Sequence, residues 1–115
     1  MSIVSIANAE HYIWGDHCDG WHFLKTPNLS VIREQVPPGK SEKRHCHQIA
    51  QQFFYILAGQ AIMELDGQEF RLSAGQGIHI PPEKPHQFRN PFSEPVEFMV
   101  ISNPTTRGDR IDLDA

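Results

Sequence analysis

The sequence predicts an all-β protein. Helical periodicity of apolar residues is absent after residue 20, whereas proline and glycine, nine and eight of them in 115 residues, separate short segments rich in Val, Ile, Phe and Leu. Turn signals recur about every ten residues, which is typical of an antiparallel sandwich, jelly roll or barrel. We therefore expect at least seven strands in one small antiparallel fold.

Each strand is defined by an apolar run and the turn that ends it. In chain order the expected strands are LSVIREQV (29–36), a His-x-His segment, FFYILAG (53–59), AIMEL and QEFRL (61–72), GIHIPP (77–82), HQFRN (86–90) and VEFMVIS (96–102). Asp66-Gly67 is a strong signal for a two-residue hairpin. Residues 1–25 are the least legible, and we expect an edge strand there or an arm that reaches a second subunit.

Composition limits the classes of function. The length fits a single domain, 1–115. A net charge of −4 and no basic cluster longer than Lys43-Arg44 argue against a nucleic-acid partner. No apolar run approaches the roughly 20 residues that cross a bilayer, and the start does not look like a signal peptide, so we expect a cytoplasmic protein without a membrane partner. Cys18 and Cys46 are too few for a disulfide scaffold and should be reduced.

The segment RHCHQ carries the first chemical signal. Alternate side chains of a strand face the same way, so His45 and His47 should point together to one side and Cys46 to the other. Imidazole suits iron, nickel, copper and zinc, and two ligands from one strand leave the other positions to other strands. The spacing alone is a weak signal, because most isolated His-x-His pairs have no metal.

Two blocks around this pair resemble the two signature motifs of the cupin superfamily. The first block is Gly39, five residues, His45-x-His47, four residues, Gln52, six residues and Gly59; the second is Gly75, five residues, Pro81, four residues, His86, three residues and Asn90. The resemblance, with motif 1 at 39–59 and motif 2 at 75–90, implies a double-stranded β-helix, the jelly-roll cupin barrel. It also implies one divalent transition metal (Fe, Ni, Cu, Zn or Mn), held by His45, His47, Gln52 and His86.

The sequence departs from these motifs at two positions. Glu83 replaces the glycine of the second motif, which should alter only a turn, and Gln52 replaces the acid of the first. Gln51 aligns instead if the preceding loop is one residue shorter, but only Gln52 keeps six residues before Gly59. A glutamine brings no charge, so the metal would keep its full +2, favour transition metals over magnesium or calcium, and act as a stronger Lewis acid. A barrel without metal, with its histidines hydrogen-bonded to one another and to Gln52, is the alternative.

Strand parity extends the site. An inward Gln52 brings Phe54 and Ile56 to the same face, and His86 brings Phe88, so these three aromatic and aliphatic residues are candidates for substrate binding as well as ordinary core residues. Apolar walls suit a small organic ligand, whereas a phosphorylated sugar would need inward Arg or Lys that these strands do not obviously supply. His79 is either an acid/base in the cavity or an outward residue.

The expected function follows from the metal site by analogy with the family. We expect a metal-dependent dioxygenase or related oxidoreductase; the alternatives are a non-redox metal enzyme (sugar isomerase, epimerase, decarboxylase or lyase) and a non-catalytic small-molecule-binding protein. Parity places Phe53, Tyr55 and Leu57 on the outer face, and covering such a face favours a homodimer. The run SEKRH should be a solvated loop with Glu42 and Lys43 at the surface.

Overall fold

The computed structural model describes residues 3–113, so the two residues at each end of the predicted domain, and the start of the segment 1–25, lie outside it. Within that range the chain forms strands and no helix, which confirms the predicted all-β class. In chain order they are β1 (Glu10–Trp14), β2 (Cys18–Lys25), β3 (Ser30–Val36), β4 (His45–His47), β5 (Gln51–Ala58), β6 (Gln60–Leu65), β7 (Gln68–Ser73), β8 (Gly77–Ile80), β9 (His86–Arg89), β10 (Val96–Asn103) and β11 (Arg110–Asp112).

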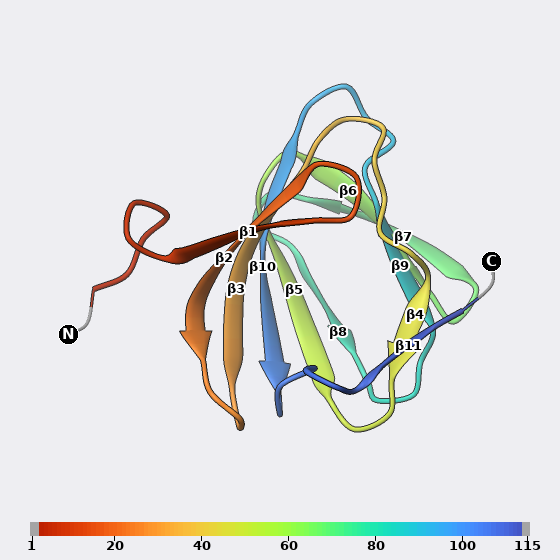
Figure 1. The fold of residues 1–115 in the computed structure, drawn as a ribbon. Helices are drawn as coiled ribbons and strands as arrows, with labels where there is room; N and C mark the ends of the chain where they lie inside the picture. Colours follow the sequence, from red (N-terminus) through yellow and green to blue (C-terminus); the bar gives the residue numbers. More distant parts are fainter. Residues whose placement is uncertain (1–2, 114–115) are drawn as a thin grey trace.

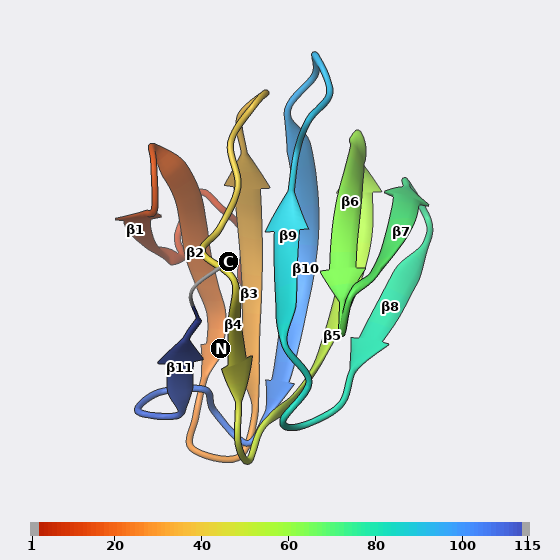
Figure 2. The ribbon, with the colours of Figure 1, turned by 90° about the vertical axis from the view of Figure 1, so that its right-hand side faces the viewer.

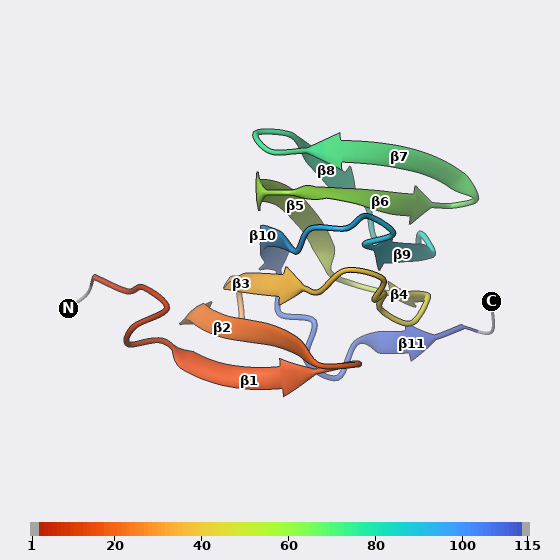
Figure 3. The ribbon, with the colours of Figure 1, turned by 90° about the horizontal axis from the view of Figure 1, so that it is seen from above.

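The strands form two antiparallel sheets that face each other (Figure 1). One sheet has the order β1-β2-β3-β10-β5-β8 and the other the order β11-β4-β9-β6-β7. Seen from above, the β1–β2 hairpin and β11 lie at one side of the molecule and β6 and β7 at the other (Figure 3). The described residues contain no helix that is long and apolar enough to cross a membrane.

The two ends of the chain add strands that the sequence did not define. The segment 1–25, for which the sequence predicted no definite strand, contains β1 and β2. Strand β1 lies at the edge of the six-stranded sheet and pairs only with β2 in the described range. Near the other end, the three-residue strand β11 lies beside β4 (Figure 2) and pairs with it. In the register of this pair, Arg110 is opposite His47 and Asp112 is opposite His45. Both additions therefore lie on the side of the barrel where the histidine pair is.

Alternation along β5 divides the inner face from the outer one. Gln52, Phe54 and Ile56 are buried, whereas Phe53, Tyr55 and Leu57 are each about two-fifths exposed, as parity predicted. The inward residues of both sheets form one core, in which the Phe88 and Phe98 rings stack with their centroids 4.1 Å apart. Dimerisation through the outer face stays a prediction.

Turns within and between the two histidine motifs need backbone conformations that glycine favours. The hairpin at Asp66-Gly67 is confirmed, with φ of 52° and 91°. Gly59 has φ of 84°, and a β-carbon there would collide with the Pro95 carbonyl. Glu83, at the position where the second motif has glycine, still has φ of 72°, so the glutamate keeps the left-handed turn at a steric cost.

Asn90, the last residue of the second motif, is fully buried and ties three segments of main chain together. Its amide nitrogen donates to the carbonyls of Val36 and Glu94 at 3.1 and 2.8 Å, and its oxygen accepts from the Phe92 N–H at 3.0 Å. The asparagine therefore fixes the end of β9 against β3 and the loop before β10, which positions His86 at the other end of β9.

Candidate metal centre

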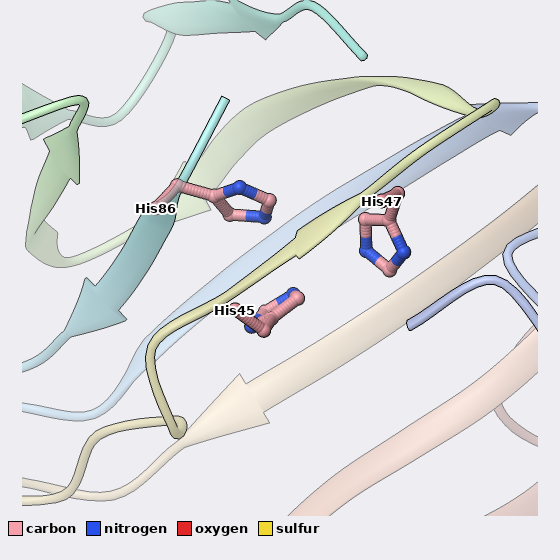
Figure 4. A group of neighbouring side chains, drawn as sticks. All are labelled: His45, His47 and His86. Atoms are coloured by element: carbon pink, nitrogen blue, oxygen red, sulfur yellow. The ribbon is translucent and has the colours of Figure 1, made fainter. Parts of the chain in front are cut away.

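Two neighbouring strands bring the three predicted histidines together. His45 and His47 lie on the same face of β4, and His86 begins β9, directly opposite His45 in the antiparallel register. All three are buried, and one ring nitrogen of each lies within 4.8 Å of those of the other two. Figure 4 shows the rings converging on one space between the strands. These residues could hold a metal ion.

Main-chain carbonyl groups set the orientation of each ring. The Nδ1 atoms of His45 and His86 lie 2.7 and 3.0 Å from the carbonyls of Lys43 and Lys84, each two residues earlier in the chain. The Nδ1 atom of His47 lies 2.9 Å from the Asp109 carbonyl. A carbonyl only accepts, so each Nδ1 carries the proton and each Nε2 keeps a free lone pair.

These Nε2 atoms face one another without hydrogen bonds. Those of His47 and His86 are buried and have no protein partner among the described residues. The predicted alternative, histidines hydrogen-bonded to one another, is therefore not the arrangement observed, because the Nδ1 protons are already donated to the main chain. Three converging lone pairs fit a borderline cation such as zinc, iron, nickel or copper.

Burial keeps the imidazoles neutral, as metal ligands must be. Desolvation lowers the pKa of His45 to about 3 and that of His86 to about 4, and it also lowers the pKa of His47. Neighbouring rings add to the effect for His45 and His86, because a charge on one disfavours a charge on the next. At neutral pH the cluster therefore presents lone pairs rather than positive charge.

Gln52 approaches the same cavity from the opposite sheet. Its side-chain nitrogen donates to Ser102 Oγ at 3.1 Å, a residue directly across from it on β10, and this contact fixes the amide. Its Oε1 atom is buried and has no protein partner among residues 3–113. The neighbouring Gln51 points outward, where its Oε1 lies 2.9 Å from Nε2 of the exposed His79. Gln52 is thus the inward glutamine, and His79 lies outside the cavity.

A cavity of about 280 Å³ opens beside the histidines. His45, His47, Gln52 and Phe54 line it, together with residues from β1, β2, β3, β10 and the C-terminal segment. Of the three candidate substrate contacts, Phe54 therefore reaches the cavity, while Ile56 and Phe88 lie in the core. The Phe54 ring bridges the two regions, with its centroid 6.3 Å from that of His86 and 5.7 Å from that of Phe88.

Two carboxyl groups that we had not assigned to the site also line this cavity. The prediction of Glu42 at the surface is wrong: its side chain is largely buried, and its Oε2 accepts the Phe88 N–H at 2.8 Å. Glu34 accepts a hydrogen bond from the Tyr12 hydroxyl at 2.8 Å. Desolvation raises the pKa of Glu42 to about 8 and that of Glu34 to about 7.

The sequence carried a signal for one of these acids. Glu34 alternates with Ile32 and the buried Val36 in the strand predicted over 29–36, so parity places it on the inner face. Glu42 lies among charged residues outside any predicted strand and gave no such signal. Arg110, which also lines the cavity, lies on the unpredicted β11; its side chain is partly exposed and its Nε donates to Asp112 Oδ1 at 2.7 Å.

Asp109 fastens the loop between the histidine pair and Gln52. Its carboxylate accepts hydrogen bonds from the N–H groups of Gln48, Ile49 and Ala50 at 2.9, 3.1 and 2.9 Å. These bonds hold the pKa of the Asp109 carboxyl below its usual value against the opposing effect of desolvation. Since its carbonyl also accepts the His47 proton, this single residue positions a predicted ligand and the turn behind it.

Known proteins resemble the chain over most of its length. The sequence model of the family described as "Cupin domain" matches residues 32–102, which include both histidine motifs. An uncharacterised protein of Methanocaldococcus jannaschii, MJ1618, is 35% identical over 83 residues, or 72% of this chain and 66% of its own length. The quercetin 2,3-dioxygenase of Bacillus subtilis is 36% identical over 59 residues, or 51% of this chain and 18% of its own.

The fold is also found among solved structures. The polyketide cyclase RemF from Streptomyces resistomycificus superposes with a TM-score of 0.86 at 18% identity, covering 100% of this chain and 87% of that one. At that identity the likeness shows the fold alone. The chain spans 66% of MJ1618 and less than a fifth of the dioxygenase.

Proposed function

The chain belongs to the cupin family, and we propose that it is a metal-dependent enzyme that acts on a small organic molecule. The observation that carries this proposal is the convergence of three buried imidazoles, each with its Nδ1 proton donated to the main chain, beside a cavity. Rings oriented in this way have no hydrogen-bonding role left for Nε2 except toward a ligand. The fold itself assigns no reaction, because this architecture hosts many activities.

The proposed ligands are His45, His47, His86 and the side-chain oxygen of Gln52. Ser102 holds the Gln52 amide nitrogen, so its unpaired oxygen is the atom available to a cation, directly or through water. A divalent transition metal at this place supplies a Lewis acid for an oxygen atom of the bound molecule. Four neutral ligands leave the full charge of the cation, which favours a molecule that binds as an anion.

The cavity suits a small ligand with both apolar and polar parts. Phe54, Trp14 and Val100 supply apolar wall, and Arg110 supplies a positive charge. A volume of about 280 Å³ is close to the lower limit for ligand pockets, so we propose a molecule smaller than a typical drug.

Among reaction classes we propose oxidation by dioxygen first. The sequence identity with quercetin 2,3-dioxygenase over 59 residues supports it, and so does a neutral ligand set that favours an anionic oxygen donor. Non-redox chemistry at a carbonyl group is the second candidate, because carboxyl groups line the cavity beside the histidines and offer sites for protons.

Elemental analysis of untagged protein from unsupplemented cells tests the site, and metal exchange then tests the reaction. We expect about one transition metal per chain, and oxygen uptake by the iron-loaded protein with β-diketones, flavonols or thiols. Turnover that persists when redox-silent zinc replaces iron would select the second candidate. A protein that binds none of iron, nickel, copper, zinc and manganese after reloading would refute a metal enzyme of either class.

A further inference from the structure

A row of residues across three strands forms a feature that the metal centre does not explain. Tyr12 on β1, Gly20 on β2 and Glu34 on β3 are successive partners in the antiparallel register. A β-carbon on Gly20 would overlap the phenol of Tyr12. The absence of a side chain on β2 thus lets the Tyr12 ring cross that strand and donate to Glu34 Oε2 at 2.8 Å.

The pair faces the cavity that contains the histidines. Tyr12 and Glu34 line the same space as His45 and His47. Some glutamates of the barrel are paired with arginine, as Glu64 is with Arg44 at 2.7 Å and Glu97 with Arg33 at 3.1 Å. Glu34 has no such ion pair within 4 Å among the described residues, and its Oε1 is left without a protein hydrogen bond.

The groups around Glu34 explain how it holds a proton. Tyr12 faces it from β1, Cys18 from β2, Glu42 from the loop before β4, and Arg110 from β11. Burial raises the pKa of Glu34 to about 7, while the Tyr12 hydrogen bond and the Arg110 charge oppose that rise. Burial and the Glu34 charge also raise the pKa of Tyr12, so the phenol keeps its proton and remains the donor.

We propose that Glu34 is the catalytic residue that transfers protons to and from a molecule bound beside the three histidines, and that Tyr12 positions it. The inference rests on the proposed function but holds for either reaction class. Ionised Glu34 takes a proton at Oε1 from a C–H or O–H bond of the bound molecule. The electron pair of that bond stays on the molecule, and the same carboxyl later returns the proton, so the proton transfer itself balances without a further reactant; the oxidation class also consumes dioxygen.

Tyr12 determines which carboxyl oxygen is used. Because the phenol donates to Oε2 and Glu34 lines the cavity, Oε1 is the oxygen without a protein partner and the one we assign to the bound molecule. A purely structural clamp between β1 and β3 would show the same hydrogen bond. The two roles differ in the pH at which Glu34 titrates and in what its removal does to proton exchange.

Carbon NMR of protein labelled at the glutamate carboxyl, loaded with Co²⁺, tests the placement. We expect one resonance that is lost in Glu34→Gln, titrates near pH 7 without metal, and is shifted or broadened by the paramagnetic ion. Tyr12→Phe should raise that midpoint, since a donor to the carboxylate is lost. The paired Glu97 is the matched control and should not respond. An ordinary midpoint near pH 4.5, or no effect of bound Co²⁺, would overturn the placement.

Exchange of the methyl protons of pyruvate in D₂O, followed by proton NMR on zinc-loaded protein, tests the chemistry. We expect the rate to rise with pH through the Glu34 midpoint, to fall at least about 100-fold in Glu34→Gln, and to stay unchanged in Glu97→Gln. Tyr12→Phe should move the rise to higher pH. Exchange by the wild-type protein no faster than by Glu34→Gln overturns the inference. Failure to bind zinc or Co²⁺ counts instead against the proposed metal site. The titration of Glu34 in the metal-free protein then still tests whether its midpoint is raised.

Discussion

Two walls of one cavity are built in different ways. The histidine wall consists of His45 and His47 on β4, which line the cavity, and the adjoining His86 on β9. Its rings are oriented by main-chain carbonyls of Lys43, Asp109 and Lys84. The acid wall, on β1 to β3, depends on a contact between two side chains, Tyr12 and Glu34. Main-chain acceptors persist when neighbouring side chains change, whereas a contact between side chains is lost with either partner. The ligand wall should therefore tolerate substitution of the Lys43 and Lys84 side chains, because only their carbonyls orient the rings. The acid wall should be disrupted by substitution of either Tyr12 or Glu34.

Burial disfavours charge on both walls, but by opposite changes in proton affinity. It lowers the pKa of His45 and His86 to about 3 and 4, and it raises the pKa of Glu34 to about 7. The histidine wall thus offers lone pairs at any pH near neutrality. The acid wall instead changes its charge in that range, so the two walls suit a cation and a transferable proton respectively.

Removal of one ligand from the histidine wall should have the largest effect. We expect His86→Ala to lower metal affinity by more than the roughly 10–100-fold that loss of an outer hydrogen-bond partner costs, because Nε2 is a direct ligand in the proposed site. The matched control is His79→Ala, since His79 is exposed and lies against Gln51 outside the cavity. Metal titration monitored by calorimetry measures both. Equal affinities in the two variants would contradict the ligand set.

Removal of the Asp109 carboxylate, which holds the loop after the histidine pair, should have the second largest effect on metal affinity. Asp109→Ala removes the acceptor of three loop N–H groups, which frees the main chain whose carbonyl orients His47. We expect metal affinity to fall about 10–100-fold, with little change in stoichiometry. Asp112→Ala is the control, because Asp112 lies on the same strand segment but its side chain contacts Arg110. A loss as large in the control would mean that β11 pairing, not Asp109, positions the ring.

A charge added between the two walls should have a smaller effect. Gln52→Glu restores the acid of the family motif and gives up the hydrogen bond to Ser102. We expect binding of the harder cation Mn²⁺ to tighten by about tenfold, because the carboxylate adds attraction that an amide lacks. Gln51→Glu, one residue away and outward, is the control. Competition titrations against a chelator report the change, and unaltered Mn²⁺ affinity would place residue 52 away from the cation.

The same contrast explains which residues the sequence revealed. Strand alternation was enough to place His45 and His47 on one face, because that placement depends on local register alone. The resemblance to the cupin motifs added His86, which lies on a neighbouring strand. The outward position of His79 needed the pairing of β5 with β8. Arg110 reaches the cavity from a three-residue strand whose pairing with β4 spans more than sixty positions of sequence, as the Asp109–Gln48 bond does. No local pattern encodes such a pairing.

Parity was informative for the acid wall only in part. It places Glu34 on the inner face of β3, but nothing local shows that Gly20 leaves room for Tyr12 to reach it across β2. Glu42 was predicted as a surface residue because it lies among charges, yet its carboxylate accepts a main-chain N–H from β9. Long-range hydrogen bonds therefore determined the positions that the sequence missed.

The smallest expected effect is on stability, and it distinguishes the acid wall from ordinary surface acids. A carboxyl whose folded pKa is raised stabilises the fold below its unfolded pKa of about 4.5, and this contribution is lost as pH rises through about 7. Glu34→Gln removes that dependence. When the pH is raised from 5 to 8, the unfolding free energy of metal-free wild type should fall by about 1–2 kcal/mol more than that of metal-free Glu34→Gln. Urea unfolding at both pH values measures this difference. Glu97→Gln loses only the ion pair with Arg33, so its unfolding free energy should follow the same pH dependence as that of wild type. Parallel pH profiles for Glu34→Gln and wild type would mean that Glu34 is ionised throughout this range.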